Sequence, residues 1–373
     1  MNKGGVGRRG GWVRWSLLFL GGASLLLGLS LALSLLGVWP SLPPADSSAH
    51  AQAMTLGFLG TLISLERAIA LRERWAMLSP AALGIGGILL LVFPPVAHVL
   101  HTLGMLLLVI VYARLSNRGL TIALSIQILG SLAGMGAAIL WWAGVSTPAV
   151  IPWLTAFLVL TIVGERVELA AFALPQHAEI VAWLLALALV LGAAIVLAAG
   201  RGDEALGLIL LGHAAWLARF DIARTTISGI GLVRYAAANM LAATAWLGAA
   251  GLALVLGGRL SVSPVYDTVV HAVTIGFTLS MIMAHAPIIL PAVIGKPLPY
   301  RSAFWVPTVL VNGGLLVRVL ADIRGLDVMW QIGGTVLIVA QLIFVLVAAG
   351  SARARATTTP GRQSAGTNTM ESQ

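Results

Sequence analysis

The sequence contains no cysteine among its 373 residues, and only 9% of those residues are charged. The first absence excludes disulfides, iron–sulfur clusters, thiolate ligands of haem and cysteine nucleophiles. Any metal would be bound by His, Met, Glu, Asp or Tyr. The second absence, with 59% hydrophobic residues and a mean hydropathy of +0.98, excludes an ordinary soluble domain. The composition therefore predicts an all-α membrane protein without a separate extramembrane catalytic domain.

Several functional motifs are also missing. The sequence has no GxxxxGK[ST] loop, no GxGxxG segment after a strand and no HExxH helix, so nucleotide-driven transport and zinc proteolysis have no support. The net charge of +9 does not indicate nucleic-acid binding, because the basic residues flank apolar runs instead of forming a long basic stripe. The expected partner is the lipid bilayer. The oligomeric state stays open.

Apolar runs long enough to cross a hydrocarbon core of roughly 30 Å recur along most of the chain. We expect one transmembrane domain over residues 1–350 and a disordered cytoplasmic tail over 351–373, which is rich in Thr, Ser, Gly and Gln. The twelve expected spans are 16–38, 50–70, 76–93, 95–113, 120–143, 150–173, 178–199, 204–220, 235–257, 266–291, 302–321 and 328–350.

The distribution of basic residues predicts the orientation. With twelve spans and a cytoplasmic N-terminus, all but four of the 22 lysines and arginines fall on the cytoplasmic side, as the positive-inside rule requires. Both termini are then cytoplasmic, and the membrane is the bacterial inner membrane. The first span could instead be a secretory signal, but its length favours an uncleaved helix. The four exceptions are Arg201, Arg259, Arg318 and Arg324.

Spans two, six and ten share a spacing that suggests an internal repeat. Each has a small residue followed by Phe, and then a polar residue at the same offset: Gly57-Phe58 to Glu66, Ala156-Phe157 to Glu165, and Gly276-Phe277 to His285. A recurrence every four helices predicts a pseudo-threefold arrangement of four-helix units. Chance is the alternative, because Gly, Ala and Phe are common in such helices.

Histidines mark the outer ends of several predicted spans. His50 and His271 open spans two and ten at equivalent places in the proposed repeat, which makes them the best pair of axial ligands for a haem b. His98 and His101 lie one turn apart and are candidates for copper or a second haem. Headgroup or carbonyl hydrogen bonding is the alternative role for all four. His285 lies about four turns beyond His271, so an unbroken α-helix would place both on one face.

Charged residues gather at the inner ends of the spans. They are Glu66, Arg67, Glu165, Arg166, Glu168, Arg219, Asp221 and Arg224, with His285 at comparable depth. Intramembrane charges are unfavourable unless paired or hydrated. The favoured interpretation is a set of Glu–Arg and Asp–Arg pairs between helices. The functional alternative is a proton path or second cofactor pocket with His285 as a ligand and Glu66 and Glu165 as proton carriers.

Two local motifs carry a family resemblance. His50-Ala51 followed by Met54 and Gly57-Phe58, and His271-Ala272 followed by Thr274 and Gly276, resemble segments of the NnrS family of membrane proteins. The span plan resembles subunit I of the haem-copper oxidases, whose helices two and ten hold a low-spin haem. The resemblance implies haem bound by His50 and His271, with copper as a further cofactor, and a role in nitric oxide metabolism.

The chain departs from the oxidase pattern where the copper ligands would be. Span six offers Glu165 and Glu168, and span seven has no histidine, so oxygen reduction at a binuclear centre is not expected. The leading hypothesis is a membrane haem protein that handles nitric oxide or other redox chemistry, with enzymatic turnover left open. The alternatives are a proton-coupled or metal transporter without a prosthetic group, and an assembly or sensing subunit.

Overall fold

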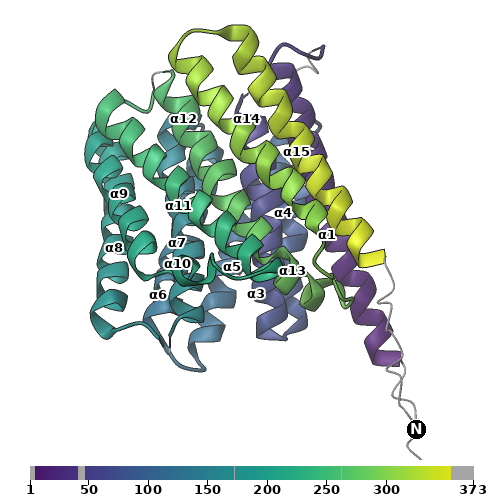
Figure 1. Ribbon diagram of the computed structural model, residues 1–373. Coiled ribbons are helices and arrows are strands. Elements are labelled where there is room, and N and C mark those ends of the chain that lie inside the picture. Colours follow the sequence, from purple (N-terminus) through teal and green to yellow (C-terminus); the bar gives the residue numbers. More distant parts are fainter. Residues whose placement is uncertain (1–4, 41–46, 172, 262, 354–373) are drawn as a thin grey trace, which may run out of the picture.

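The computed structural model describes residues 5–40, 47–171, 173–261 and 263–353, and all regular structure within these ranges is helical. Long helices run side by side between two ends of one bundle, with α12 near one end and α13 near the other (Figure 1). The predicted all-α class is confirmed. The predicted tail begins within α15, which continues to Arg353, and residues 354–373 lie outside the described residues.

The α-helices are α1 (Gly5–Leu35), α2 (Ser47–Gln52), α3 (Thr61–Leu71), α4 (Leu78–Leu89), α5 (Pro94–Ser116), α6 (Ile122–Trp142), α7 (Thr147–Leu169), α8 (Gln176–Ala199), α9 (Asp203–Phe220), α10 (Ala223–Thr226), α11 (Gly231–Gly257), α12 (Val265–His271), α13 (Ser280–Ile294), α14 (Trp305–Ile323) and α15 (Asp327–Arg353). Two π-helices, η1 (Ala53–Gly60) and η3 (Ala272–Leu279), and two 3₁₀-helices, η2 (Arg74–Met77) and η4 (Ser302–Phe304), complete the order.

The ends of the helices follow ordinary local rules. Pro94 occupies the first turn of α5, where its missing N–H leaves no hydrogen bond unmade. The Thr121 hydroxyl caps α6 by accepting a hydrogen bond from the Leu124 amide at 3.1 Å. Gly200 and Gly295 end α8 and α13 with positive φ angles, which glycine adopts without strain. Local sequence signals thus set where these helices begin and end.

Within the described ranges, ten helical segments are long and apolar enough to cross a membrane. They correspond to ten of the twelve predicted spans. The spans predicted at 76–93 and 204–220 are also helical, but α4 has only 12 residues and α9 carries Asp203, Glu204 and Arg219 at its ends. The structure therefore shows an all-α protein with ten candidate membrane spans.

Two candidate spans each contain an eight-residue π-helix near the beginning of the span. In Ser47–Leu71, α2 passes through η1 into α3, and in Val265–Ile294, α12 passes through η3 into α13. Neighbours approach both segments at a glycine. A Cβ on Gly57 would lie 2.9 Å from the Gly87 Cα of α4, and one on Gly276 would lie 2.5 Å from the Trp246 side chain of α11. Each wide turn thus sits at a tight helix contact.

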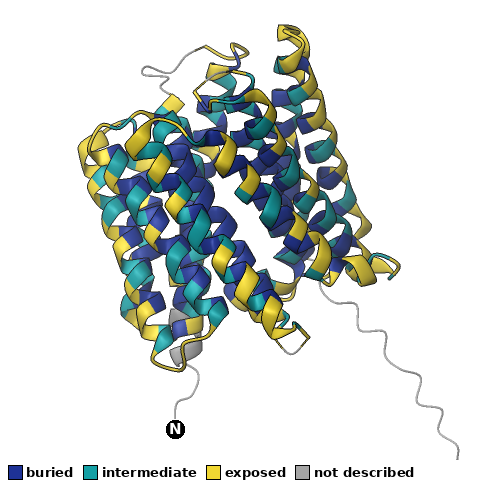
Figure 2. Cartoon of the chain, turned by 90° about the vertical axis from the view of Figure 1, so that its left-hand side faces the viewer, coloured by how far each residue is buried: buried dark blue, intermediate teal, exposed yellow. Residues whose placement is uncertain are grey.

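The third helix of the proposed repeat is different. The α7 segment is a regular α-helix. It is the most enclosed candidate span, because 83% of the residues in its most apolar stretch are buried. It packs against α6, α8, η3 and α2. Figure 2 shows the buried residues facing the interior of the bundle and the exposed residues on its periphery. The α7 helix is therefore a central helix against which both π-containing segments pack.

Candidate functional site

His50 and His271 lie at the same end of the bundle, each just before a π-helix. His50 is in α2 and His271 is the last residue of α12, and both are partly buried. The fold places the two imidazoles within electrostatic range of each other, although the residues are far apart in sequence. π-Helical turns inside α-helices are frequent at functional sites.

Hydrogen bonds fix the proton positions on both rings. The Nδ1 atom of His50 lies 2.8 Å from the Gly28 carbonyl oxygen, and that of His271 lies 2.9 Å from the Asp267 carbonyl oxygen. A carbonyl only accepts, so each Nδ1 carries the proton and donates it. In the neutral form of each ring, Nε2 then carries the lone pair. A histidine anchored in this way is typical of metal ligands, and two such nitrogens suit the axial positions of haem iron.

A charged cluster supports His271 from the neighbouring helices. Both oxygens of Asp267 accept hydrogen bonds from the Arg318 guanidinium of α14, at 2.8 and 2.7 Å, and Oδ1 lies 3.3 Å from Nδ1 of His271. The indole N–H of Trp330 in α15 donates a hydrogen bond to Asp267 at 3.3 Å. The Arg318 guanidinium lies 4.3 Å from the centroid of the Trp330 ring. His50 also interacts electrostatically with this pair. The cluster holds the His271 end of α12 against two neighbouring helices, α14 and α15.

Sequence reasoning did not assign Asp267 and Arg318 to a site. The signal for Asp267 was its position one helical turn before His271, which places both on one face. The signal for Arg318 was a charge inside an apolar run, but the topology count treated it only as an exception on the outer side. Its side chain is 7% exposed, so it is an interior residue.

His98 and His101 both lie on α5. His101 is buried against Gly86 of α4, where a Cβ would lie 2.6 Å from its ring, whereas His98 is only partly buried. Neither ring nitrogen of His101 makes a hydrogen bond of ordinary geometry. Among the described residues, no group of three or more His, Asp or Glu side chains could hold a metal ion. A copper site at these two histidines would therefore have no third His, Asp or Glu ligand in this part of the chain.

His285 lies toward the other end of the bundle and lines a cavity. The cavity has a volume of about 530 Å³ and lies among α1, α3, α7, α13 and α15. The Nδ1 atom of His285 donates to the Met281 carbonyl oxygen at 2.7 Å, which leaves Nε2 as an acceptor. The premise that an unbroken α-helix joins His271 to His285 is wrong, because η3 intervenes. His285 is therefore separate from His50 and His271.

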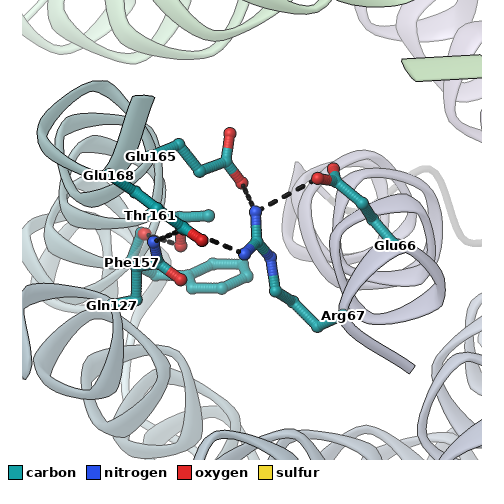
Figure 3. Close-up of polar contacts among 7 residues, drawn as sticks. All are labelled: Glu66, Arg67, Gln127, Phe157, Thr161, Glu165 and Glu168. Carbon is teal, nitrogen blue, oxygen red and sulfur yellow. Dashed lines mark hydrogen bonds and ion pairs between the residues drawn. The ribbon is translucent and has the colours of Figure 1, made fainter. Parts of the chain in front are cut away.

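Arg67 is the centre of the predicted inner charge network. Its guanidinium contacts Glu165 at 2.8 Å, Glu66 at 3.1 Å and Glu168 at 3.3 Å. Figure 3 shows Arg67 reaching from α3 toward the two glutamates on α7, with Gln127 donating to Glu168. The predicted Glu–Arg pairing between helices is confirmed. Three carboxylates share one guanidinium, so the cluster carries an excess of acid groups.

Arg166 and Asp221 do not complete that network as predicted. Among the described residues, no carboxylate oxygen lies within 4.0 Å of the Arg166 guanidinium, which donates a hydrogen bond to Met240 Sδ at 3.9 Å. Asp221 interacts electrostatically with Arg166, but its Oδ1 accepts a hydrogen bond from the Ala223 amide. Burial raises the pKa of Asp221, and that hydrogen bond opposes the rise. Arg219 and Arg224 are exposed.

The comparisons with known proteins place the chain by family. No curated protein and no solved structure matches it. A family model described as "Domain of unknown function (DUF8744)" matches residues 14–353, which include every site residue discussed above. The chain therefore belongs to the DUF8744 family.

Proposed function

We propose that this chain is an integral membrane haem-binding protein, resembling the NnrS and haem-copper oxidase-like group, that acts in nitric oxide handling or membrane redox chemistry. The observation that carries the proposal is that His50 and His271 lie within electrostatic range of each other at one end of the bundle, each with Nδ1 hydrogen-bonded to a carbonyl oxygen. Neutral imidazoles from two helices would offer their Nε2 lone pairs as the donor set that axial haem ligation needs.

The haem, when bound, would supply one-electron redox chemistry. The protein's own residues supply the rest. His50 and His271 would hold the iron, and the Gly28 and Asp267 carbonyls keep the ring protons away from Nε2. Asp267 and Arg318 hold the end of α12 against α14, which limits rotation of the His271 ring. His98 and His101 remain the candidates for copper.

The topology proposal goes beyond the ten candidate spans. We include α4 and α9 as crossing helices, giving twelve spans with both termini in the cytoplasm of a bacterial inner membrane. The π-helices in the second and tenth of these spans support equivalence of two of the three proposed four-helix units. The third member, α7, contributes Glu165 at the corresponding place and contacts the other two.

An absorption spectrum of the detergent-purified protein tests the haem proposal. We expect a Soret band and a dithionite-reduced α band in the wild type, and loss of both in His50→Ala and His271→Ala. His177→Ala is the matched control, because His177 is an exposed histidine in the connection at the start of α8. A wild-type protein that stays colourless when expressed with excess haem would contradict the proposal.

A second candidate function is proton-coupled or metal transport. It is favoured by the excess of carboxylates at Arg67 beside a cavity that Glu66 and Glu165 also line. Proteoliposomes with an internal pH dye provide the test. Substrate-dependent proton uptake that Glu165→Gln abolishes, in colourless protein, would support transport over haem binding.

A further inference from the structure

The cavity lined by His285 has a polar wall and a long apolar remainder. Its polar wall consists chiefly of Glu66, Glu165, Arg166 and His285. Most other lining side chains are aliphatic or aromatic, and they come from α1, α13 and α15, which lie together at one side of the bundle in Figure 1. Pockets of a few hundred Å³ with few convergent polar groups are typical small-ligand sites.

The location selects a membrane-soluble ligand. The helices that form the walls are candidate membrane spans, and the α1 residues Phe19 and Leu26 at the cavity are largely exposed on the surface of the bundle. Apolar surface at that position faces lipid. A molecule with an apolar tail can therefore reach the cavity from the bilayer, whereas a hydrophilic metabolite would first have to enter hydrocarbon.

The charges on the polar wall select a neutral head group. Arg166 is buried, lacks a carboxylate within 4.0 Å among the described residues, and keeps hydrogen-bond donors for a ligand. His285 Nε2 offers an acceptor, and Glu66 and Glu165 each use one oxygen on Arg67. An anionic head would face two carboxylates, and a cationic head would face Arg166. A neutral head with both accepting and donating oxygens matches all four groups.

We propose that this cavity binds a neutral, membrane-soluble aromatic lipid of the quinone and quinol class, with its ring oxygens at Arg166 and His285. The aromatic side chains of Phe58 and Phe344 line the walls beside the ring, where offset or edge contacts with another aromatic are favourable. The apolar remainder accommodates the tail. The site lies apart from His50 and His271, so its occupancy does not depend on haem.

Photoaffinity labelling of the purified full-length protein tests the proposal. The probe is an azido-substituted benzoquinol with a decyl tail, kept reduced by anaerobic handling, and labelled peptides are identified by mass spectrometry. Unlabelled competitors with the same tail separate the ligand classes: decyl-benzoquinol, decanol, decanoate and decylammonium. We expect labelling of α13 or α15 that only decyl-benzoquinol displaces efficiently. Equal displacement by decanol would show that the ring is not recognised, and stronger displacement by either ion would overturn the neutral-head assignment.

Two variants with matched controls locate the site. Arg166→Gln removes the unpaired donor, and Ala348→Phe fills the cavity from α15 while leaving every charge in place. We expect the affinity for decyl-benzoquinol to fall at least tenfold in both. The controls are Arg219→Gln and Ala199→Phe, at exposed positions outside the cavity. If Ala348→Phe folds and binds the probe as the wild type does, the proposal is wrong, whatever Arg166→Gln does.

Discussion

The two ends of the bundle hold buried arginines in different chemical settings. At the α12 end, Arg318 meets a single carboxylate, Asp267, through two parallel hydrogen bonds. At the α13 end, Arg67 meets three carboxylates, while nearby Arg166 meets none within 4.0 Å among the described residues. The first setting is balanced in charge and geometry. The second has an excess of acid at one guanidinium and an unpaired base beside a cavity.

This difference separates a fixed site from an adaptable one. A bidentate Arg–carboxylate pair has one good geometry, so Asp267 and Arg318 hold His271 in a single orientation. A guanidinium shared by three carboxylates can lose one of them and keep the others. The α13 end therefore has polar groups left for a proton or a ligand, and the α12 end does not. Variants at the two ends should respond accordingly.

The largest effect is expected for Arg67→Gln. Removing the guanidinium leaves three carboxylates close together, of which Glu165 has a side chain only 20% exposed. Loss of one partner of a buried ion pair costs about 3–5 kcal/mol. The measurement is the free energy of unfolding in mixed detergent micelles. A stability within error of the wild type would show that the carboxylates are neutralised in another way.

The two partners of the Asp267–Arg318 ion pair should contribute equally to stability. Asp267→Asn and Arg318→Gln each leave a single buried charge, so we expect both to lower stability by about 3 kcal/mol, to within about 1 kcal/mol of each other. Asp267→Asn should also weaken haem binding about 10–100-fold, because it loosens the support of His271. Haem titration of the purified variants measures the second effect. Markedly unequal stabilities would break the picture of one matched pair.

Glu165→Gln should cost less than Arg67→Gln. Arg67 keeps Glu66 and Glu168 in this variant, so the loss is one charge-assisted hydrogen bond, which contributes about 1.5–3 kcal/mol. We expect lower thermal stability and an unchanged absorption spectrum. An altered spectrum in protein of normal yield would instead place Glu165 beside a cofactor.

Arg114→Gln should have the smallest effect. Arg114 pairs with Glu73 at 3.8 Å, and its side chain is 55% exposed, so the pair contributes at most about 1 kcal/mol. The same unfolding experiment measures it. This exposed arginine is the reference for the buried arginines. If Arg114→Gln lost as much stability as Arg67→Gln, burial would not explain the difference between the arginines.

The helical plan was predictable because hydropathy reports burial in lipid directly. The ten candidate spans fall where the apolar runs predict them, and Arg67 pairs with glutamates as the favoured interpretation requires. Charges inside apolar runs need partners, so their pairing follows from composition. The proximity of His50 and His271 was predictable only through the repeat spacing and the family resemblance.

Other features lie beyond what side-chain patterns encode. The π-helices η1 and η3 change backbone hydrogen bonding without changing hydropathy, so no count of apolar residues reveals them. Arg67, and not Arg166, is the centre of the network because of how the helices are rotated about their axes. The Glu-Arg pairs in the sequence do not specify that rotation. The cavity is a property of how five helices meet, and it has no sequence signature.

The wide turn in η3 has a consequence for the geometry of the whole helix. An α-helix of 3.6 residues per turn advances by about 100° per residue. Deleting one residue from Ala272–Leu279 would let this stretch close into regular bonding and would swing α13 about its own axis by roughly that angle. His285 would leave the cavity wall while His271 stayed beside Asp267. The surplus residue thus sets an angular offset, which allows one continuous helical segment to present His271 beside Asp267 and His285 to the cavity.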